Sequence, residues 1–174
     1  LRPIPPRRRS TILLWIARGR CSPNLSWIAA GRGLSTLVEI EVDRITVTAS
    51  GMSAMMLAHQ LLVEPGGNIV CPTPQWPNVK GTVDILGGDL RSVPLHFTDD
   101  DWELDLDSLC AAVDDKTRMI FVNSPGNPTG WVMPREQQKC LLQYCREQEL
   151  WLVADEVYAR MVEFVHTGVV AGRT

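Results

Sequence analysis

Two stretches decide how this chain is expected to fold: RMIFVNSPGNPTG at residues 118–130 and LWLVADEVY at residues 150–158. Each begins with a largely apolar run, which is typical of a buried β-strand, and each ends in polar or turn-forming residues. Between them, Pro134 suits the first turn of a helix and Glu136 suits its positive amino end, so a helix is predicted from Pro134 to about Gln148. Strand, helix and strand in this order predict a unit with parallel strands.

The same alternation extends toward the amino end of the chain. Apolar or β-branched runs predict strands at residues 45–48, 68–71 and 91–95, and the segments between them predict helices at residues 52–63, 77–86 and 105–113. Pro94 disfavours a central position for the strand at residues 91–95. Because near-continuous apolar strands are typical of a sheet that is covered on both faces, we expect an α/β fold of three layers, a mostly parallel sheet flanked by helices.

Residues 1–38 do not continue this pattern. They contain seven arginines and no acidic residue, and they show no clean helical or strand period. Three interpretations stay open: sequence that is not native to the protein, a targeting segment such as an organellar transit peptide, and a divergent element of the fold. We therefore expect two parts, an irregular Arg-rich segment at residues 1–38 and a globular domain at residues 39–174.

Composition excludes several classes of function. All twenty acidic residues lie from Glu39 onward, against ten Lys and Arg, so this part carries a formal charge of −10 and offers no basic stripe for nucleic acid. No apolar run reaches the length that spans a membrane. The five cysteines form no CxxC pair and metal-ligand spacings are absent, so no metal site is predicted. We expect free thiols and a cytoplasmic protein, or an organellar one if residues 1–38 are a transit peptide.

Four polar or aromatic groups are predicted to follow strand ends, and in a parallel sheet those ends share one edge, where ligands bind. Ser50, Gly51 and Met52 open a helix, whose backbone N–H groups and dipole favour an anion such as phosphate. The ordinary alternative is a helix cap without a ligand. Trp76 follows the next strand and could stack on a heteroaromatic ring, although a core tryptophan is the ordinary alternative.

The two stretches quoted above supply the other groups. Asn127 lies in a turn rich in Gly and Pro, and its amide can donate to a phenolate oxygen. Asp155 ends an apolar strand, where a carboxylate is costly unless a cation such as a pyridinium pairs with it. Tyr158 lies just beyond, within reach of the same ring. The ordinary alternatives are a connecting loop, an aspartate that caps a turn, and a packed tyrosine.

In this order, the residues resemble the cofactor-binding core of the class I/II aminotransferases, fold-type I enzymes that depend on pyridoxal 5'-phosphate (PLP), over about residues 43–158. The resemblance implies that Ser50, Gly51 and Met52 bind the cofactor phosphate, Trp76 stacks on its ring, Asn127 and Tyr158 contact its 3-oxygen, and Asp155 pairs with its ring nitrogen. It also implies that residues 39–174 are part of a PLP-binding large domain, that the substrates are a small-molecule amino acid and a 2-oxo acid, and that the parent enzyme is a homodimer.

The chain departs from the family in one respect that concerns catalysis. Its lysines are Lys80, Lys116 and Lys139, and none has the sequence context of the family's Schiff-base lysine. We therefore assign no catalytic residue and expect a truncated fragment of the large domain that is inactive alone.

Two other functions stay open: a PLP-dependent lyase or synthase on the same fold, and an aminotransferase-like ligand-sensing domain of a transcription regulator. The latter should carry a winged helix upstream, for which residues 1–38 are too short. A nucleotide-binding α/β domain is disfavoured because the sequence has neither GxGxxG nor a P-loop.

Overall fold

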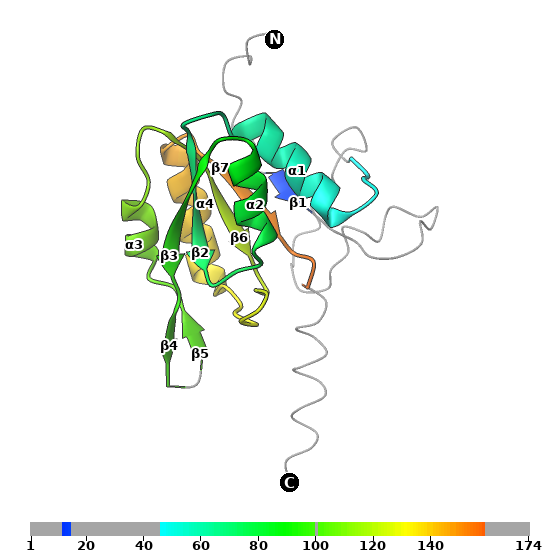
Figure 1. The fold of residues 1–174 in the computed structure, drawn as a ribbon. Coiled ribbons are helices and arrows are strands. Elements are labelled where there is room, and N and C mark those ends of the chain that lie inside the picture. Colours follow the sequence, from blue (N-terminus) through cyan, green and yellow to red (C-terminus); the bar gives the residue numbers. More distant parts are fainter. Residues whose placement is uncertain (1–11, 15–45, 100, 159–174) are drawn as a thin grey trace.

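The computed structural model describes residues 12–14, 46–99 and 101–158. Its centre is a five-stranded parallel sheet with the strand order β1-β7-β6-β2-β3, and a two-stranded antiparallel hairpin, β4–β5, continues beyond it (Figure 1). The elements are β1 (Ile12–Leu14), α1 (Gly51–Leu62), β2 (Asn68–Thr73), α2 (Asn78–Ile85), β3 (Asp89–Pro94), β4 (His96–Thr98), β5 (Asp101–Glu103), α3 (Leu106–Ala111), β6 (Thr117–Asn123), α4 (Arg135–Glu147) and β7 (Trp151–Asp155).

The sheet is the middle of three layers, because successive side chains of its strands enter two different cores. On β6, Ile120 and Val122 pack with residues of α3 and α4. Met119 and Phe121, the alternating residues, pack with residues of α1 and α2 on the opposite face. All four are buried, which explains why the central strand is apolar along most of its length. The expected α/β fold with a parallel sheet flanked by helices is therefore confirmed.

Local chemistry explains where the helices begin. The Ser50 side chain accepts a hydrogen bond from the Ser53 backbone N–H at 3.2 Å and caps α1, and Asp105 accepts from the Asp107 N–H at 3.0 Å and caps α3. α4 begins after Pro134 and carries Glu136 in its first turn and Arg146 in its last, both favourable to the helix dipole. The predicted helices at residues 52–63, 77–86 and 134–148 correspond to α1, α2 and α4.

Three local expectations differ from the structure. The strand predicted at residues 45–48 is absent over Thr46–Thr48, and Ile45 lies outside the described residues. A β-branched run forms a strand only where a neighbouring strand can pair with it, and the edge of β7 is occupied instead by β1, from the segment for which no element was predicted. The β4–β5 hairpin was also not predicted; Phe97 and Trp102 face each other across it, with ring centroids 5.3 Å apart. The rest of residues 1–38 lies outside the described residues.

A group of four side chains, the amino-edge cluster, joins the amino ends of the strands. It consists of Asn68, Arg91, Asp114 and Thr117. The Thr117 hydroxyl donates to Asn68 Oδ1 at 2.7 Å, and Asn68 Nδ2 donates to Asp114 Oδ1 at 2.9 Å. The Arg91 guanidinium forms an ion pair with the same carboxylate. The hydrogen bond from Asn68 is the main reason why the pKa of Asp114 falls to about 2. The cluster ties the loop after α3 to β2 and β3.

Candidate functional site

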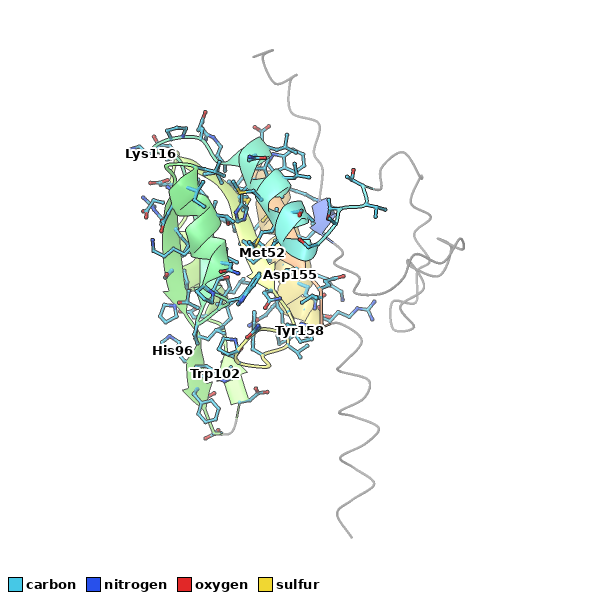
Figure 2. All side chains as sticks on the ribbon, turned by 45° about the vertical axis from the view of Figure 1, so that its right-hand side comes forward. Met52, His96, Trp102, Lys116, Asp155 and Tyr158 are labelled. Carbon is cyan, nitrogen blue, oxygen red and sulfur yellow. The ribbon has the colours of Figure 1, made fainter. Side chains whose placement is uncertain are left out.

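The carboxyl ends of β2, β6 and β7 lie together at the other edge of the sheet. Asn123, the last residue of β6, is in register with Asp155, the last residue of β7. The Asn123 side-chain amide and the Ser124 backbone N–H both donate to the Asp155 backbone carbonyl at 3.1 Å. Figure 2 shows Lys116, which precedes β6, at the far end of the sheet from Tyr158. The parallel topology thus brings both stretches that the sequence singled out to one edge.

The Asp155 carboxyl is the most unusual group at this edge. The residue is only 6% exposed, and Oδ1 accepts a hydrogen bond from the Val157 backbone N–H at 3.1 Å. Among the described residues no Lys, Arg or His side chain forms an ion pair with it. Burial raises its pKa, and burial followed by the charge of Asp155 raises the pKa of the neighbouring Glu156. A buried carboxyl in this state is suited to a cationic ligand group.

Asn127 and Tyr158 lie next to each other at the same edge. The Asn127 side-chain amide donates to the Tyr158 hydroxyl oxygen at 3.3 Å, and the Asn127 backbone N–H donates to Asn123 Oδ1 at 2.8 Å. The loop can hold this shape because Gly126 has no Cβ, which would lie 2.8 Å from the Thr129 hydroxyl oxygen. An amide and a phenol in contact can both donate to a single oxygen atom of a ligand.

The amino end of α1 lies near this edge. The side-chain amide of Asn78, the first residue of α2, donates a weak hydrogen bond to the Met52 sulfur, with 3.6 Å between the nitrogen and the sulfur. The Ser50 hydroxyl caps the helix through Ser53, and the backbone N–H groups of Gly51 and Met52 have no acceptor among the described residues. Free N–H groups at the positive end of a twelve-residue helix favour an anion.

Trp76 lies in the loop between β2 and α2, and both of its sequence-based interpretations have support. It is partly buried and packs against the core beneath α1 and α2, as a core tryptophan would. It nevertheless stays partly exposed to solvent, which is compatible with a ligand-binding role.

A small hollow beside the site was not anticipated from the sequence. It borders about 230 Å³ of space, part of which is open solvent, and of the predicted site residues only Asn127 lines it. The other lining residues come from the ends of β2 and β6, the loops that follow them, and the position directly after β3: Pro72, Pro74, Gln75, Leu95, Asn123, Gly126, Thr129 and Trp131. Gln75 carries no motif in the sequence, and only the fold reveals that it lines a hollow together with residues of a second loop.

The lysines of the chain are engaged elsewhere or lie at the wrong edge. Lys80 forms an ion pair with Asp84 at 2.7 Å on the surface of α2, and Lys139 forms one with Glu136 at 2.6 Å on α4. Lys116 lies at the amino edge, beside Asp114. The described residues contain no group of three or more His, Cys, Asp or Glu side chains that could hold a metal ion, and no helix among them is long and apolar enough to cross a membrane.

The sequence and the fold of this chain are similar to those of known proteins. Residues 28–168 match the family "Aminotransferase class I and II". The chain is 29% identical to a probable aspartate aminotransferase of Methanocaldococcus jannaschii over 72% of this chain and 32% of that protein, and 32% identical to an aspartate aminotransferase of Musicola paradisiaca over 66% and 28%. The solved structure of an alanine aminotransferase from Pyrococcus furiosus superimposes with a TM-score of 0.60 and 31% identity over 64% of this chain and 28% of that one. The chain therefore spans about 30% of the length of the relatives it matches.

Proposed function

The chain belongs to the class I and II aminotransferase family, whose members depend on PLP, and from that membership we propose that its carboxyl edge binds PLP for the transfer of an amino group from an amino acid to a 2-oxo acid. The observation that carries the proposal is the buried Asp155 carboxyl without a cationic partner among the described residues, next to the contact between Asn127 and Tyr158. A protonated ring nitrogen would supply the missing cation.

Each of the seven residues has a role in this proposal. The N–H groups of Gly51 and Met52, with the Ser50 hydroxyl, would hold the phosphate at the amino end of α1. Trp76 would cover one face of the ring. Asn127 and Tyr158 would donate to the oxygen of the ring, and Asp155 would keep its nitrogen protonated. When bound, PLP supplies the electron-withdrawing ring that stabilises negative charge at the carbon next to the amino group.

We further propose an amino acid and a 2-oxo acid as the substrates of this transfer and a homodimer as the assembly of the parent enzyme. The part of the reaction that these residues would perform is to bind and orient the cofactor and to hold a proton at its ring nitrogen. We propose that the 174 residues alone do not transaminate, because Lys80, Lys116 and Lys139 lie away from Asp155 and Tyr158 or are paired with acids.

A PLP titration of the purified chain, followed by quenching of tryptophan fluorescence, tests the proposal. Replacing Asp155 with Ala removes a charge-assisted hydrogen bond, and we expect the affinity to fall by about 1.5–3 kcal/mol. Asp84→Ala, which removes an exposed carboxylate on α2, is the matched control and should bind PLP as the wild type does.

Two outcomes would contradict this proposal. Equal affinity of Asp155→Ala and the wild type would show that the ring nitrogen is not held by Asp155. Conversion of an amino acid and 2-oxo acid pair at an ordinary enzymatic rate by the same preparation would show that one of the three lysines supplies the missing base, and single Lys→Ala variants would identify it.

A further inference from the structure

The side chain of Asn123 joins the two stretches of chain that form the candidate site. Asn123 ends β6 and is in register with Asp155 at the end of β7. Its Oδ1 accepts a hydrogen bond from the Asn127 backbone N–H at 2.8 Å, and its Nδ2 donates one to the Asp155 backbone carbonyl at 3.1 Å. The same carbonyl also accepts the Ser124 backbone N–H, so Asn123 adds a second bond where the strands end. One amide therefore holds both the loop after β6 and the end of β7.

These contacts close a ring through the residues that would bind the cofactor. One branch runs from Asn123 to Asn127, whose side-chain amide donates to the Tyr158 hydroxyl oxygen at 3.3 Å. The other branch runs to Asp155, whose Oδ1 accepts from the backbone N–H of Val157 at 3.1 Å, and Val157 directly precedes Tyr158 in the chain. Because the ring is closed, a shift of Asn127 relative to Asp155 must break at least one of these hydrogen bonds.

An asparagine side chain is suited to both contacts at this position. Its amide carries an acceptor oxygen and a donor nitrogen on the same carbon, so it can accept from one backbone group and donate to another. An ionised aspartate offers acceptors alone, and a leucine of similar shape offers neither donor nor acceptor. Glutamine carries the same amide one methylene farther from the backbone. The residue type at position 123 thus matches the two backbone groups that it joins.

We propose that Asn123 is a positioning residue of the cofactor site. It fixes Asn127, which would donate to the oxygen of the ring, relative to Asp155, which would hold the ring nitrogen. These two ligand atoms belong to one rigid aromatic ring, so the protein groups must keep a fixed spacing to reach both. Groups that are held in place before the ligand arrives avoid the cost of ordering them on binding. The role of Asn123 in cofactor binding rests on the proposed function, whereas the hydrogen-bonded ring does not.

The variant Asn123→Leu tests the hydrogen-bonded ring in the unliganded chain. The chain has two tyrosines, so fluorotyrosine labelling gives two ¹⁹F NMR signals, which Tyr158→Phe assigns. We expect the Tyr158 signal to shift or broaden in Asn123→Leu, because Asn127 is no longer held beside the phenol. The Tyr144 signal is the internal control and should stay in place, since its hydroxyl donates to the Cys110 carbonyl at 3.0 Å, between α4 and α3.

The affinity for PLP distinguishes a positioning role from a purely structural one. It should fall about 2- to 12-fold in Asn123→Leu, the equivalent of one hydrogen bond. The fall should be smaller when Asn127→Ala is already present, because Asn123 acts partly through that residue. Asn68→Leu is the matched control, since Asn68 also accepts one side-chain hydrogen bond and donates another, but at the amino edge. This control should lower the urea midpoint and leave both the PLP affinity and the Tyr158 signal unchanged.

The hydrogen-bonded ring and its role in binding can fail separately. An unchanged Tyr158 signal in a folded Asn123→Leu protein, or an equal loss of PLP affinity in Asn68→Leu, would overturn the proposal. If Asn123→Leu does not fold, Asn123→Gln, whose amide lies one methylene farther out, must produce the change at Tyr158. A wild-type chain that does not bind PLP would refute the proposed function and with it the role of Asn123 in cofactor binding. The Tyr158 signal would still decide whether Asn123 holds the loop.

Discussion

The two edges of the sheet treat their polar groups in opposite ways. At the amino edge, Asn68, Asp114 and Thr117 are joined by hydrogen bonds of 2.7–2.9 Å, and Arg91 pairs with the shared carboxylate. At the carboxyl edge, the Asp155 carboxyl has a backbone N–H as its only hydrogen-bond partner among the described residues, and the Gln75 carbonyl oxygen has none. The polar groups of the amino edge therefore satisfy each other, whereas at the carboxyl edge two buried oxygen-bearing groups, the Asp155 carboxyl and the Gln75 amide, have few or no partners among the described residues.

The contrast between the two edges suggests that one end of the strands serves the stability of the fold and the other end serves ligand binding. Polar groups that satisfy each other lock the loops that join the strands, which stabilises the fold. Polar groups that are held in place but left without partners cost stability and give affinity when a complementary ligand arrives. Substitutions at the two edges should consequently have effects of different kinds.

The largest expected effect concerns a residue at neither edge. His59 of α1 is fully buried; its Nδ1 lies 2.7 Å from the Thr82 hydroxyl and its Nε2 has no partner among the described residues. Burial lowers its pKa from 6.5 to about 4, so between these values the unfolded chain binds more protons than the folded one. Stability should thus be retained above pH 6.5 and decrease by about 3 kcal/mol on acidification to pH 4.

Urea unfolding of the wild type and of His59→Leu across pH 4–8 checks this expectation. The difference between the two proteins should carry the pH dependence, and PLP affinity at pH 8 should be the same in both. If the PLP affinity of His59→Leu differed from that of the wild type, a residue of the core would also affect ligand binding, and the contrast between the two edges would not hold.

Asn68→Ala probes the amino edge. The substitution removes one buried and one part-buried side-chain hydrogen bond, and Thr117 and Asp114 then keep only their other partners, so the free energy of unfolding should fall by about 2 kcal/mol. The folded protein should bind PLP with unchanged affinity. Asn78→Ala is the control, because its side chain makes only a 3.6 Å contact with the Met52 sulfur, and it should cost much less in urea unfolding. Equal losses in the two variants would contradict the stabilising role of the amino-edge cluster.

The smallest effect has the most informative sign. Asp155→Asn replaces an unpaired buried carboxyl with a neutral group, and we expect it to raise the free energy of unfolding by up to about 1 kcal/mol at pH 7. The raised pKa of Asp155 means that stability falls as the pH rises through this pKa.

Asp114 should show the opposite behaviour. Its pKa is about 2, so its contribution to stability is present above pH 3.8 and is lost as the pH falls toward 2, and Asp114→Asn should destabilise the chain.

Calorimetry of these two variants without ligand makes the comparison directly. Changes of the same sign would show that the two edges do not differ in the way proposed. A stabilised Asp155→Asn protein that also binds PLP poorly would show that Asp155 lowers the free energy of unfolding and raises the affinity for the cofactor.

Much of the fold was predictable because the strongest signals are local. The apolar runs at residues 118–122 and 150–154 are central strands, and Pro94 correctly indicated that β3 lies at the edge of the described sheet. Pro134 and the acidic first turn located the start of α4 to within a residue. The strand expected at residues 45–48 failed because pairing is a property of the neighbouring strand, which no local pattern contains.

By itself, the sequence determined the alternation of strands and helices, the family, and the residue types that could grip a pyridine ring. Only the tertiary structure decided that Asp155 is buried without a cation among the described residues, that Asn127 touches Tyr158 across 31 residues of chain, and that the loops after β2 and β6 line one hollow. The physical reason is that periodicity and turn chemistry act between near neighbours in sequence, whereas desolvation and hydrogen-bond partnership depend on which distant loops the parallel strands bring to the same edge.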